Sequence, residues 1–346
     1  MSSALLPELT DAERLTGVLR AAGALSGGRV REVAVESTQH TILSQIVRLR
    51  VAHEGPADGA PSNLILKTCH PERVETFAFS GRNEVAFYRD LAPRMPLGSV
   101  PRCFDAQHDE TTKRWHVLLE DLSATHMIAT QWPIPPDTVQ CEAVVAALAQ
   151  AHAAWWNDPR LGRSVGEMPN ANRFDVFTER FARFRERLGD RLTPERCDLY
   201  LRLLDQAPRL SARLSHLTIV HGDAHVWNFL LPRTGAGAAV LFDWDSWRAG
   251  AGSADLAYMI ALHWYPERRA RLESHLLDHY HAALLANGVK GYSRETLRDD
   301  YRRSTLFHIL TPVQQAWMNI PPVIWWNHYE RIMMAVDDLG CRELID

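Results

Sequence analysis

Two carboxylates and one amide stand next to two short apolar runs in the second half of the chain. Asp223 and Asn228 follow the run Leu217–Val220, and Asp243 follows directly on the run Ala239–Phe242. Mg²⁺ takes oxygen ligands and keeps several waters, so one amide and one carboxylate suffice beside substrate phosphates. Asn228 and Asp243 are therefore predicted to bind Mg²⁺. Asp223 is then left to accept the proton of an attacking hydroxyl group.

The two apolar runs are the elements that must position these side chains. Both are rich in branched or aromatic residues, and both are flanked by polar or glycine-containing segments. Runs of this length and composition are typical of short buried strands. We expect two such strands to deliver Asp223, Asn228 and Asp243 to one place.

The spacing of these residues resembles that of a known family. His221-Gly222-Asp223, then Asn228 after four intervening residues, then Asp243 at the end of a strand resemble the catalytic core of the aminoglycoside phosphotransferase and choline kinase superfamily. The resemblance implies a small-molecule kinase with a protein-kinase-like fold. It also implies that Asp223 is the catalytic residue and that Asp243 bridges the metal and the phosphates.

Two differences from protein kinases favour the small-molecule branch of this fold. Protein kinases carry His-Arg-Asp in the first motif and Asp-Phe-Gly in the second. Here Gly222 replaces the arginine, and Trp244-Asp245 replaces Phe-Gly. The resemblance extends from about Lys67 to Tyr258, and the rest of the helical part is where members of the superfamily differ.

A lysine and a glutamate in the first third of the chain are the predicted phosphate-binding pair. Lys67 lies in the predicted strand Asn63–Cys69 and is the only lysine among the first 112 residues. A strand lysine can also lie at a sheet edge and point to water. By resemblance, Lys67 contacts the α- and β-phosphates and is held by a helix glutamate. Glu84, in the predicted helix Arg82–Leu91, is the expected partner, and Glu75 is the competing candidate.

The nucleotide is expected to meet two further segments. Glu120 and Leu122, in the connector after the last N-terminal strand, are predicted to bind the purine through backbone groups. The turn Ser37–Leu43 between the first two strands contains no glycine, whereas protein kinases place several glycines over the phosphates. Hydroxyl and amide side chains or backbone N–H groups are the expected substitutes.

Several neighbouring residues have structural alternatives to a functional role. His221 is expected to organise the loop through backbone contacts. His225 and Trp227 either line the acceptor pocket or pack in the interior. Asp245 is either a secondary metal or water contact or a structural carboxylate. Asp255 begins a predicted helix and resembles a family position that steadies the catalytic loop.

The order of predicted elements indicates the fold class. A β-rich segment with one important helix precedes a connector near Glu120–Thr125, and a mostly helical segment with a small β insertion follows. This order predicts an α+β, bilobal protein-kinase-like fold, with a nucleotide-binding lobe at residues 1–122 and a catalytic and acceptor-binding lobe at 123–346. Strands are predicted at about 29–37, 44–53, 63–69, 102–107 and 115–119, and helices at about 10–22, 71–79, 82–91, 137–156, 174–188, 253–263, 267–287, 294–318 and 323–340. Thr193-Pro194-Glu195 is predicted to open one more helix, with a cap residue followed by proline at the first helical position.

Composition excludes several other classes of protein. The chain has 346 residues and a net charge of −4, which gives no sign of the basic patch of a nucleic-acid-binding protein. Five scattered cysteines without a Cys-x-x-Cys pattern favour a reducing compartment. The sequence lacks both a signal-peptide pattern and an apolar run long enough to span a bilayer. A cytoplasmic protein without a membrane partner is therefore expected, and its oligomeric state is left open.

Three functions fit these observations. The favoured one is a Mg²⁺-dependent phosphotransferase that moves the γ-phosphoryl group of ATP or GTP to a hydroxyl of a small molecule, with antibiotics and secondary metabolites as typical acceptors by resemblance. A choline or amino-alcohol kinase is the alternative within the class, and a catalytically silent nucleotide-binding module is the alternative outside it. A zinc hydrolase built on His221 and His225 is disfavoured, because the metalloprotease pattern requires glutamate where Gly222 stands.

Overall fold

The computed structural model describes residues 8–70, 72, 74–75, 78–167, 171–214, 216–234 and 237–345. These residues form two compact units. The first unit contains the described parts of Met1–Ile128 and Leu230–Ser246, and the second contains those of Ala129–Phe229 and Trp247–Asp346. The assignment of nucleotide binding to residues 1–122 and of acceptor binding to 123–346 stays a prediction.

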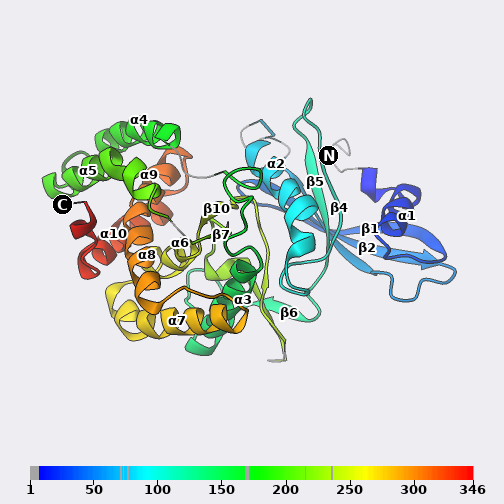
Figure 1. Cartoon of the computed structure of the whole chain (residues 1–346). Helices are drawn as coiled ribbons and strands as arrows, with labels where there is room; N and C mark the ends of the chain where they lie inside the picture. The colour runs from blue at the N-terminus through cyan, green and yellow to red at the C-terminus, as the bar shows by residue number, and fades with distance from the viewer. Residues whose placement is uncertain are drawn as a thin grey trace. The chain divides into compact units, whose positions relative to one another are not determined.

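A five-stranded antiparallel sheet is the main element of the first unit (Figure 1). Its spatial order is β1-β2-β3-β5-β4. All five strands fall where the sequence predicts them, and the predicted α+β class is confirmed. The strands are β1 (Arg29–His40), β2 (Ser44–Glu54), β3 (Asn63–Cys69), β4 (Cys103–His108) and β5 (Trp115–Glu120).

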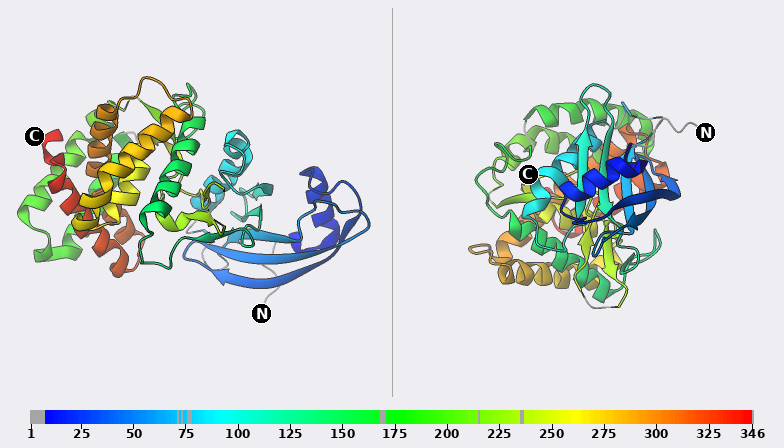
Figure 2. Two further views of the ribbon diagram at one scale, coloured as in Figure 1. Left: turned by 90° about the horizontal axis from the view of Figure 1, so that it is seen from below. Right: turned by 90° about the vertical axis from the view of Figure 1, so that its right-hand side faces the viewer.

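Helix α1 (Ala12–Ala21) packs on β1 and closes the core of this unit, as the left view of Figure 2 shows. Its Leu15 and Leu19 are fully buried beside Val47 and Leu49 of β2. Each such side chain contributes roughly 1.5–3 kcal/mol when it leaves water. The core therefore fixes one face of the sheet and the register of β2.

Helix α2 (Ala78–Ala86) continues into a π-helical turn at Phe87–Leu91. The predicted break at Gly81 is wrong, since the helix runs through this residue. A Cβ atom at Gly81 would lie only 2.0 Å from the indole Nε1 of Trp115. The glycine is therefore required for close packing of α2 on β5 rather than for a helix end. The helix predicted over 71–79 includes residues 71, 73, 76 and 77, which lie outside the described residues.

A second sheet of the first unit has the order β6-β8-β9. Its strands are β6 (His126–Ile128), β8 (Phe229–Pro232) and β9 (Val240–Leu241). β6 and β8 are antiparallel, with His126 opposite Pro232. Strand β9 lies within the second predicted apolar run, and Asp243 follows two residues after its end.

The second unit is mostly helical. Helices α3 and α7 pack alongside each other, and the left view of Figure 2 shows them in green and amber. Asp137 and Gln140 form a complete capping box at the start of α3. The helices are α3 (Thr138–Ala154), α4 (Ala171–Leu188), α5 (Pro194–Ser211), α6 (Ser253–Ala257) with a π-helical turn at Tyr258–Leu262, α7 (Pro266–Ala286), α8 (Arg294–Phe307), α9 (Leu310–Trp317) and α10 (Pro322–Asp338).

The single helix predicted over 294–318 is wrong. The structure has two helices there, α8 and α9, separated at His308 and Ile309. Pro312 lacks the N–H group that would donate to the His308 carbonyl in a continuous helix. The chain therefore starts a new helix that accommodates the proline in its first turn.

A two-stranded antiparallel sheet in the second unit positions the loop that contains Asp223. β7 (Leu217–Val220) pairs with β10 (Arg248–Ala251), and Val220 lies opposite Arg248. The two predicted apolar runs thus form strands, but β7 and β9 belong to different sheets. Among the described residues, no helix has the length and apolar character needed to cross a bilayer.

Candidate active site

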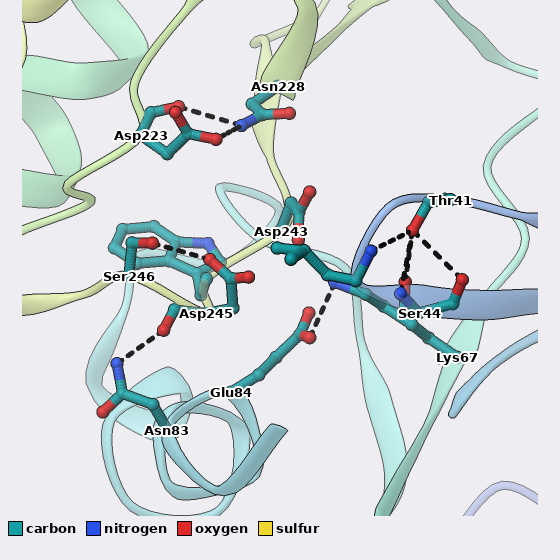
Figure 3. A network of polar contacts seen from close by, with 12 residues as sticks. Thr41, Ser44, Lys67, Asn83, Glu84, Asp223, Asn228, Asp243, Asp245 and Ser246 are labelled. Atoms are coloured by element: carbon teal, nitrogen blue, oxygen red, sulfur yellow. Dashed lines mark hydrogen bonds and ion pairs between the residues drawn. The ribbon is translucent and has the colours of Figure 1, made fainter. Parts of the chain in front are cut away.

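A buried lysine in β3 is the centre of a charged cluster in the first unit. Lys67 Nζ lies 2.7 Å from Glu84 Oε2 on α2 and forms a second ion pair with Asp243 Oδ1 (Figure 3). The Glu84 side chain is 1% exposed, whereas that of Asp243 is 35% exposed. Of the two glutamates considered from the sequence, the structure pairs Glu84 with Lys67, and Glu75 is exposed. The cluster therefore presents one accessible carboxylate beside a fixed positive charge.

Electrostatics keep this lysine charged. Burial alone would lower the pKa of Lys67, but Asp243, Glu84 and Asp245 together outweigh burial and raise that pKa. Burial also raises the pKa of Glu84 to about 7, although Lys67 favours the ionised carboxylate. A cation held in a weakly polarisable interior attracts anions more strongly than one in water. Lys67 is thus suited to bind phosphate oxygens.

The residues after Asp243 form what we call the Trp244 latch, made of Trp244, Asp245, Asn83 and Phe87. The Trp244 side chain is fully buried, and its indole stacks on the Phe87 ring at a centroid distance of 4.0 Å and an interplanar angle of 6°. Asn83 Nδ2 donates to the Asp245 carbonyl at 2.7 Å (Figure 3). Asp243 itself has φ of +68°, a left-handed conformation that costs a non-glycine residue energy. The latch ties this conformation to α2, the helix that carries the partner of Lys67.

The glycine-free turn between β1 and β2 is closed by hydroxyl groups. The Ser44 amide donates to Thr41 Oγ1 at 2.9 Å, and the two hydroxyl oxygens lie 3.0 Å apart. The Thr41 amide donates to the Ser44 carbonyl at 2.8 Å. Figure 3 shows Thr41 and Ser44 on the same side of the sheet as the head of Lys67. Side-chain hydrogen bonds therefore set a turn shape for which protein kinases use glycine.

The predicted purine-binding connector has some of its backbone groups occupied. The Glu120 amide donates to the Arg102 carbonyl at 2.9 Å. The Leu122 carbonyl accepts from the amides of Thr125 at 3.0 Å and His126 at 2.8 Å. These bonds orient the connector between β5 and β6.

Asp223 lies in the loop after β7, within the second unit. The Tyr258 hydroxyl donates to its Oδ1. Asn228 Nδ2 donates to the Asp223 carbonyl at 2.8 Å and to Oδ2 at 3.3 Å (Figure 3). His225 Nε2 lies 3.6 Å from the same Oδ2, and the carboxylate keeps 32% exposure. Both carboxylate oxygens are thus fixed in direction while the group stays open to solvent.

A buried carboxylate underneath holds the backbone of this loop. Asp255, on α6, accepts from the amides of His221 at 2.6 Å and Gly222 at 2.9 Å. His152 Nε2 lies 3.1 Å from Asp255, and its Nδ1 lies 2.7 Å from the Tyr280 hydroxyl. Burial opposes the charge on Asp255, but the hydrogen bond and charge of His152 and the bonds to the loop lower its pKa. Asp255 is therefore ionised and holds the two loop amides in place. This is the role expected from the family position that it resembles.

Beside Asp223 lies a row of rings, which we call the imidazole row: His225, Trp227, His263 and His328. Ring centroids are 5.9 Å apart for His225 and His263, 6.0 Å for Trp227 and His263, and 4.5 Å for His263 and His328. Burial lowers the pKa of His263 well below its usual value and that of His328 to about 3. His225 and Arg331 both oppose a positive charge on these two rings and add to the lowering. These two imidazoles are therefore neutral at neutral pH.

The predicted metal ligands have the oxygen chemistry that Mg²⁺ prefers. Asn228 uses its amide nitrogen on Asp223, so that its amide oxygen is the atom suited to a cation. Asp243 offers a partly exposed carboxylate. Within the described part of the chain, no group of three or more His, Cys, Asp or Glu residues could hold a metal ion. Each of these two donors suits a cation that completes its shell with water and phosphate oxygens.

The structure places the predicted site residues in two groups and adds several supporting partners that the sequence did not indicate. The structure brings Lys67, Glu84 and Asp243 together in one unit, and it brings Asp223 and Asn228 together in the other. The added partners are Tyr258, His152, Asn83 and the Phe87–Trp244 stack. Asn83 directly precedes Glu84, which the sequence assigns to the site, so it is the one missed partner with a signal in the sequence.

Comparisons with solved structures identify the fold. The choline kinase from Cryptosporidium parvum matches with a TM-score of 0.56 at 12% identity, covering 96% of this chain and 95% of that one. The GDP complex of aminoglycoside 2′-phosphotransferase-IIIa matches with a TM-score of 0.54 at 11% identity, covering 95% and 99%. The streptomycin–ATP complex of APH(2″)-IIa matches with a TM-score of 0.50 at 13% identity, covering 95% and 96%. The predicted kinase-like fold is confirmed.

The match to a protein-family model includes the predicted site residues. The phosphotransferase enzyme family matches residues 49–294, which include Lys67, Glu84, Asp223, Asn228 and Asp243. No curated protein matches the chain. The match spans well over half of the sequence, and the predicted relation to aminoglycoside phosphotransferases and choline kinases is confirmed. The chain belongs to the phosphotransferase enzyme family.

Proposed function

We propose that the protein is a Mg²⁺-dependent phosphotransferase that moves the γ-phosphoryl group of ATP or GTP to a hydroxyl of a small molecule. The observation that carries the proposal is the buried Lys67, paired with both Glu84 and the accessible Asp243. Kinases use such a lysine, glutamate and aspartate to bind phosphates and metal. Membership of the phosphotransferase enzyme family supports it.

In this proposal Lys67 binds the α- and β-phosphates, and Glu84 keeps its ammonium group in position. Asn228 and Asp243 would hold Mg²⁺, which neutralises phosphate charge when it is bound. The Trp244 latch limits the movement of Asp243, because its stacked and hydrogen-bonded residues would have to separate first. Pre-positioned charges need no rearrangement during the reaction, which is how such sites lower the barrier.

Asp223 is the proposed catalytic residue. Its carboxylate accepts from Tyr258 and Asn228, and these bonds fix the direction of its lone pairs. An acceptor hydroxyl that donates to the exposed side of this carboxylate would be oriented for attack on the γ-phosphorus. Phosphoryl transfer has a loose transition state, so orientation contributes more than early proton removal.

The nucleotide is proposed to meet the connector between β5 and β6. Because the Leu122 carbonyl already accepts from Thr125 and His126, we expect a purine to use the Leu122 amide. Glu120 would contribute its carbonyl, since its amide is bonded to Arg102. Relatives of this fold have been solved with GDP and with ATP, which supports a purine donor without choosing between the two.

The imidazole row gives an indication of the charge of the acceptor. Rings from His225, Trp227 and His263 lie beside the Asp223 carboxylate, and Arg331 places a positive charge near His263. The uncharged His263 ring and the positive charge of Arg331 favour a neutral or weakly charged hydroxylated acceptor, such as an antibiotic or a secondary metabolite, over a polycation. Choline or another amino alcohol is the second candidate, because aromatic rings also bind quaternary ammonium groups and a choline kinase shares the fold.

A screen tests this function. The protein is incubated with Mg²⁺ and either ATP or GTP, and with separate sets of neutral polyols, amino alcohols and aminoglycosides. Mass spectrometry then detects the gain of one phosphoryl group. We expect a product from the neutral set. Nucleotide binding without turnover on any acceptor would instead support the silent nucleotide-binding module.

A further inference from the structure

The second unit contains a cavity of about 150 Å³ that the proposed reaction does not use. Its walls come from helices α4, α6, α8 and α9, from strands β7 and β10, and from the chain after α5. Three phenylalanines and two leucines form its apolar part: Phe174, Phe177, Phe307, Leu214 and Leu310. The rings of Phe174 and Phe307 are nearly parallel, with centroids 5.8 Å apart. An apolar cavity of this size holds roughly one aromatic ring.

The charged groups of this cavity are all basic. Arg248 and Arg303 line it, and the lining includes no carboxylate. Arg303 Nη1 donates to Asp300 Oδ1 at 2.7 Å, while its Nε is buried without a hydrogen-bond partner among the described residues. His308, which also lines the cavity, has its pKa lowered to about 4 by burial and is neutral at neutral pH. A buried guanidinium N–H without a partner is costly, and a carboxylate would satisfy it.

The cavity lies against the back of the loop that contains Asp223. Val220 lines the cavity and directly precedes His221. His308 Nε2 lies 2.8 Å from the Ala254 carbonyl. Ala254 directly precedes Asp255, which holds the loop amides. The His308 ring also lies 5.5 Å from that of Tyr258, whose hydroxyl donates to Asp223. A ligand in the cavity would therefore touch Val220, Ala254 and His308, which are direct neighbours of the loop and of the residues that support it.

We propose that this cavity binds a small aromatic carboxylate, with its ring among the three phenylalanines and its carboxylate at Arg248 and Arg303. An apolar body with a single acidic group matches both the walls and the charge. A cationic ligand would meet two guanidinium groups and no counter-ion in the lining. The proposal is independent of phosphoryl transfer, because binding is measured without nucleotide.

Isothermal titration with benzoate as the probe tests this site. Benzyl alcohol and benzylamine serve as neutral and cationic probes of the same ring size. We expect benzoate to bind with one-to-one stoichiometry and at least roughly tenfold more tightly than benzyl alcohol, the range of one charge-assisted hydrogen bond. Benzylamine should bind more weakly than either.

Three variants locate the binding. Arg248→Met should weaken benzoate binding about tenfold or more, and Leu214→Trp should abolish it by filling the cavity. Arg298→Met is the matched control, because Arg298 is exposed on α8 and outside the lining. Thermal unfolding shows whether each variant is folded. Arg303 is left in place because it balances the buried Asp300.

Two results would overturn the proposal. One is a titration in which benzoate gives no heat of binding at concentrations up to about 10 mM. Such a result would mean that the affinity is too weak for a specific site. The other is an unchanged benzoate affinity in both Arg248→Met and Leu214→Trp when these variants are folded. Phosphoryl transfer in the screen above would be unaffected by either result, so the two proposals fail separately.

Discussion

The carboxylate of Asp223 is held on two sides, by the Tyr258 hydroxyl and by the Asn228 amide. Asp223→Asn keeps the size of the side chain and one acceptor oxygen but removes the negative charge. We expect the turnover number to fall by roughly 10²–10⁴-fold, the usual contribution of general acid–base help. Nucleotide affinity should change little, because the proposed phosphate ligands are other residues. Steady-state kinetics on an acceptor from the screen measures both quantities.

The shape of the kinetic change decides between two roles for Asp223. If only the KM for the acceptor rises and turnover is kept, Asp223 contributes uniform binding rather than catalysis. A fully active Asp223→Asn variant would remove it from the reaction altogether.

Lys67 is one of only three lysines in the chain, with Lys113 and Lys290. Lys67→Ala removes the buried cation that Glu84 and Asp243 surround, so nucleotide use should weaken while the fold survives. Lys113→Ala is the matched control, since Lys113 is a partly exposed lysine of the same unit near Glu110. Surface substitutions of this kind usually change stability by less than about 0.5 kcal/mol. The KM for nucleotide should rise in the first variant only, and equal values in both would exclude Lys67 from the site.

At the scale of elements, the Trp244 latch connects the segment after β9 to helix α2. Trp244→Ala would leave a cavity against Phe87 and should lower the free energy of unfolding by about 3–5 kcal/mol. Phe79→Ala, an exposed aromatic residue on the same helix, should change it by less than about 0.5 kcal/mol. Urea unfolding measures both. A loss below about 1 kcal/mol for Trp244→Ala would mean that the stack does not stabilise the unit.

The elements that sequence reasoning placed correctly are those with a local signal. The alternation of Val47, Leu49 and Val51 with two arginines marks β2, because one face of the strand is buried. Gly81 misled the prediction, since glycine also allows close packing on Trp115. Strand β10 was missed because Arg248–Ala251 contains none of the branched or aromatic residues that mark β7, and its partner β7 lies far away in the sequence.

The whole molecule should lose stability in mild acid because of its buried histidines. The pKa of His308 is lowered from 6.5 to about 4, and Arg248 opposes its charge while Asp255 favours it. His308 is thus neutral in the folded protein, whereas the unfolded chain takes up a proton below about pH 6.5. Its contribution to stability is therefore present above that pH and is lost as the pH falls toward 4. The slope per histidine reaches up to about 1.4 kcal/mol per pH unit.

A pair of variants tests this dependence. His308→Gln keeps a group that can bond the Ala254 carbonyl but does not titrate, so the slope of unfolding free energy between pH 6.5 and 4 should decrease. His40→Gln, at an exposed position, should leave the slope unchanged. Equal slopes in the wild-type protein and His308→Gln would show that His308 does not take up its proton on unfolding.

Over the whole molecule, the candidate site divides into parts that the sequence reveals and parts that only folding creates. Asp223, Asn228 and Asp243 follow strands at fixed spacing, so their types and positions are readable from the chain. Tyr258 and His152 act through contacts that span 35 and 103 residues, which no local pattern encodes. The charge state of His328 likewise depends on burial by distant elements.

The chain passes from one unit to the other three times, after Ile128, Phe229 and Ser246. A gene cut once after Ile128 would therefore encode Lys67 and Glu84 on one fragment, but it would leave Asp243 on the other. Recombination at a single crossover could not exchange the first unit intact, and two breakpoints around Leu230–Ser246 would also be needed. The ion pair of Lys67 with Asp243 thus requires that both stretches come from the same parent whenever the first unit is exchanged.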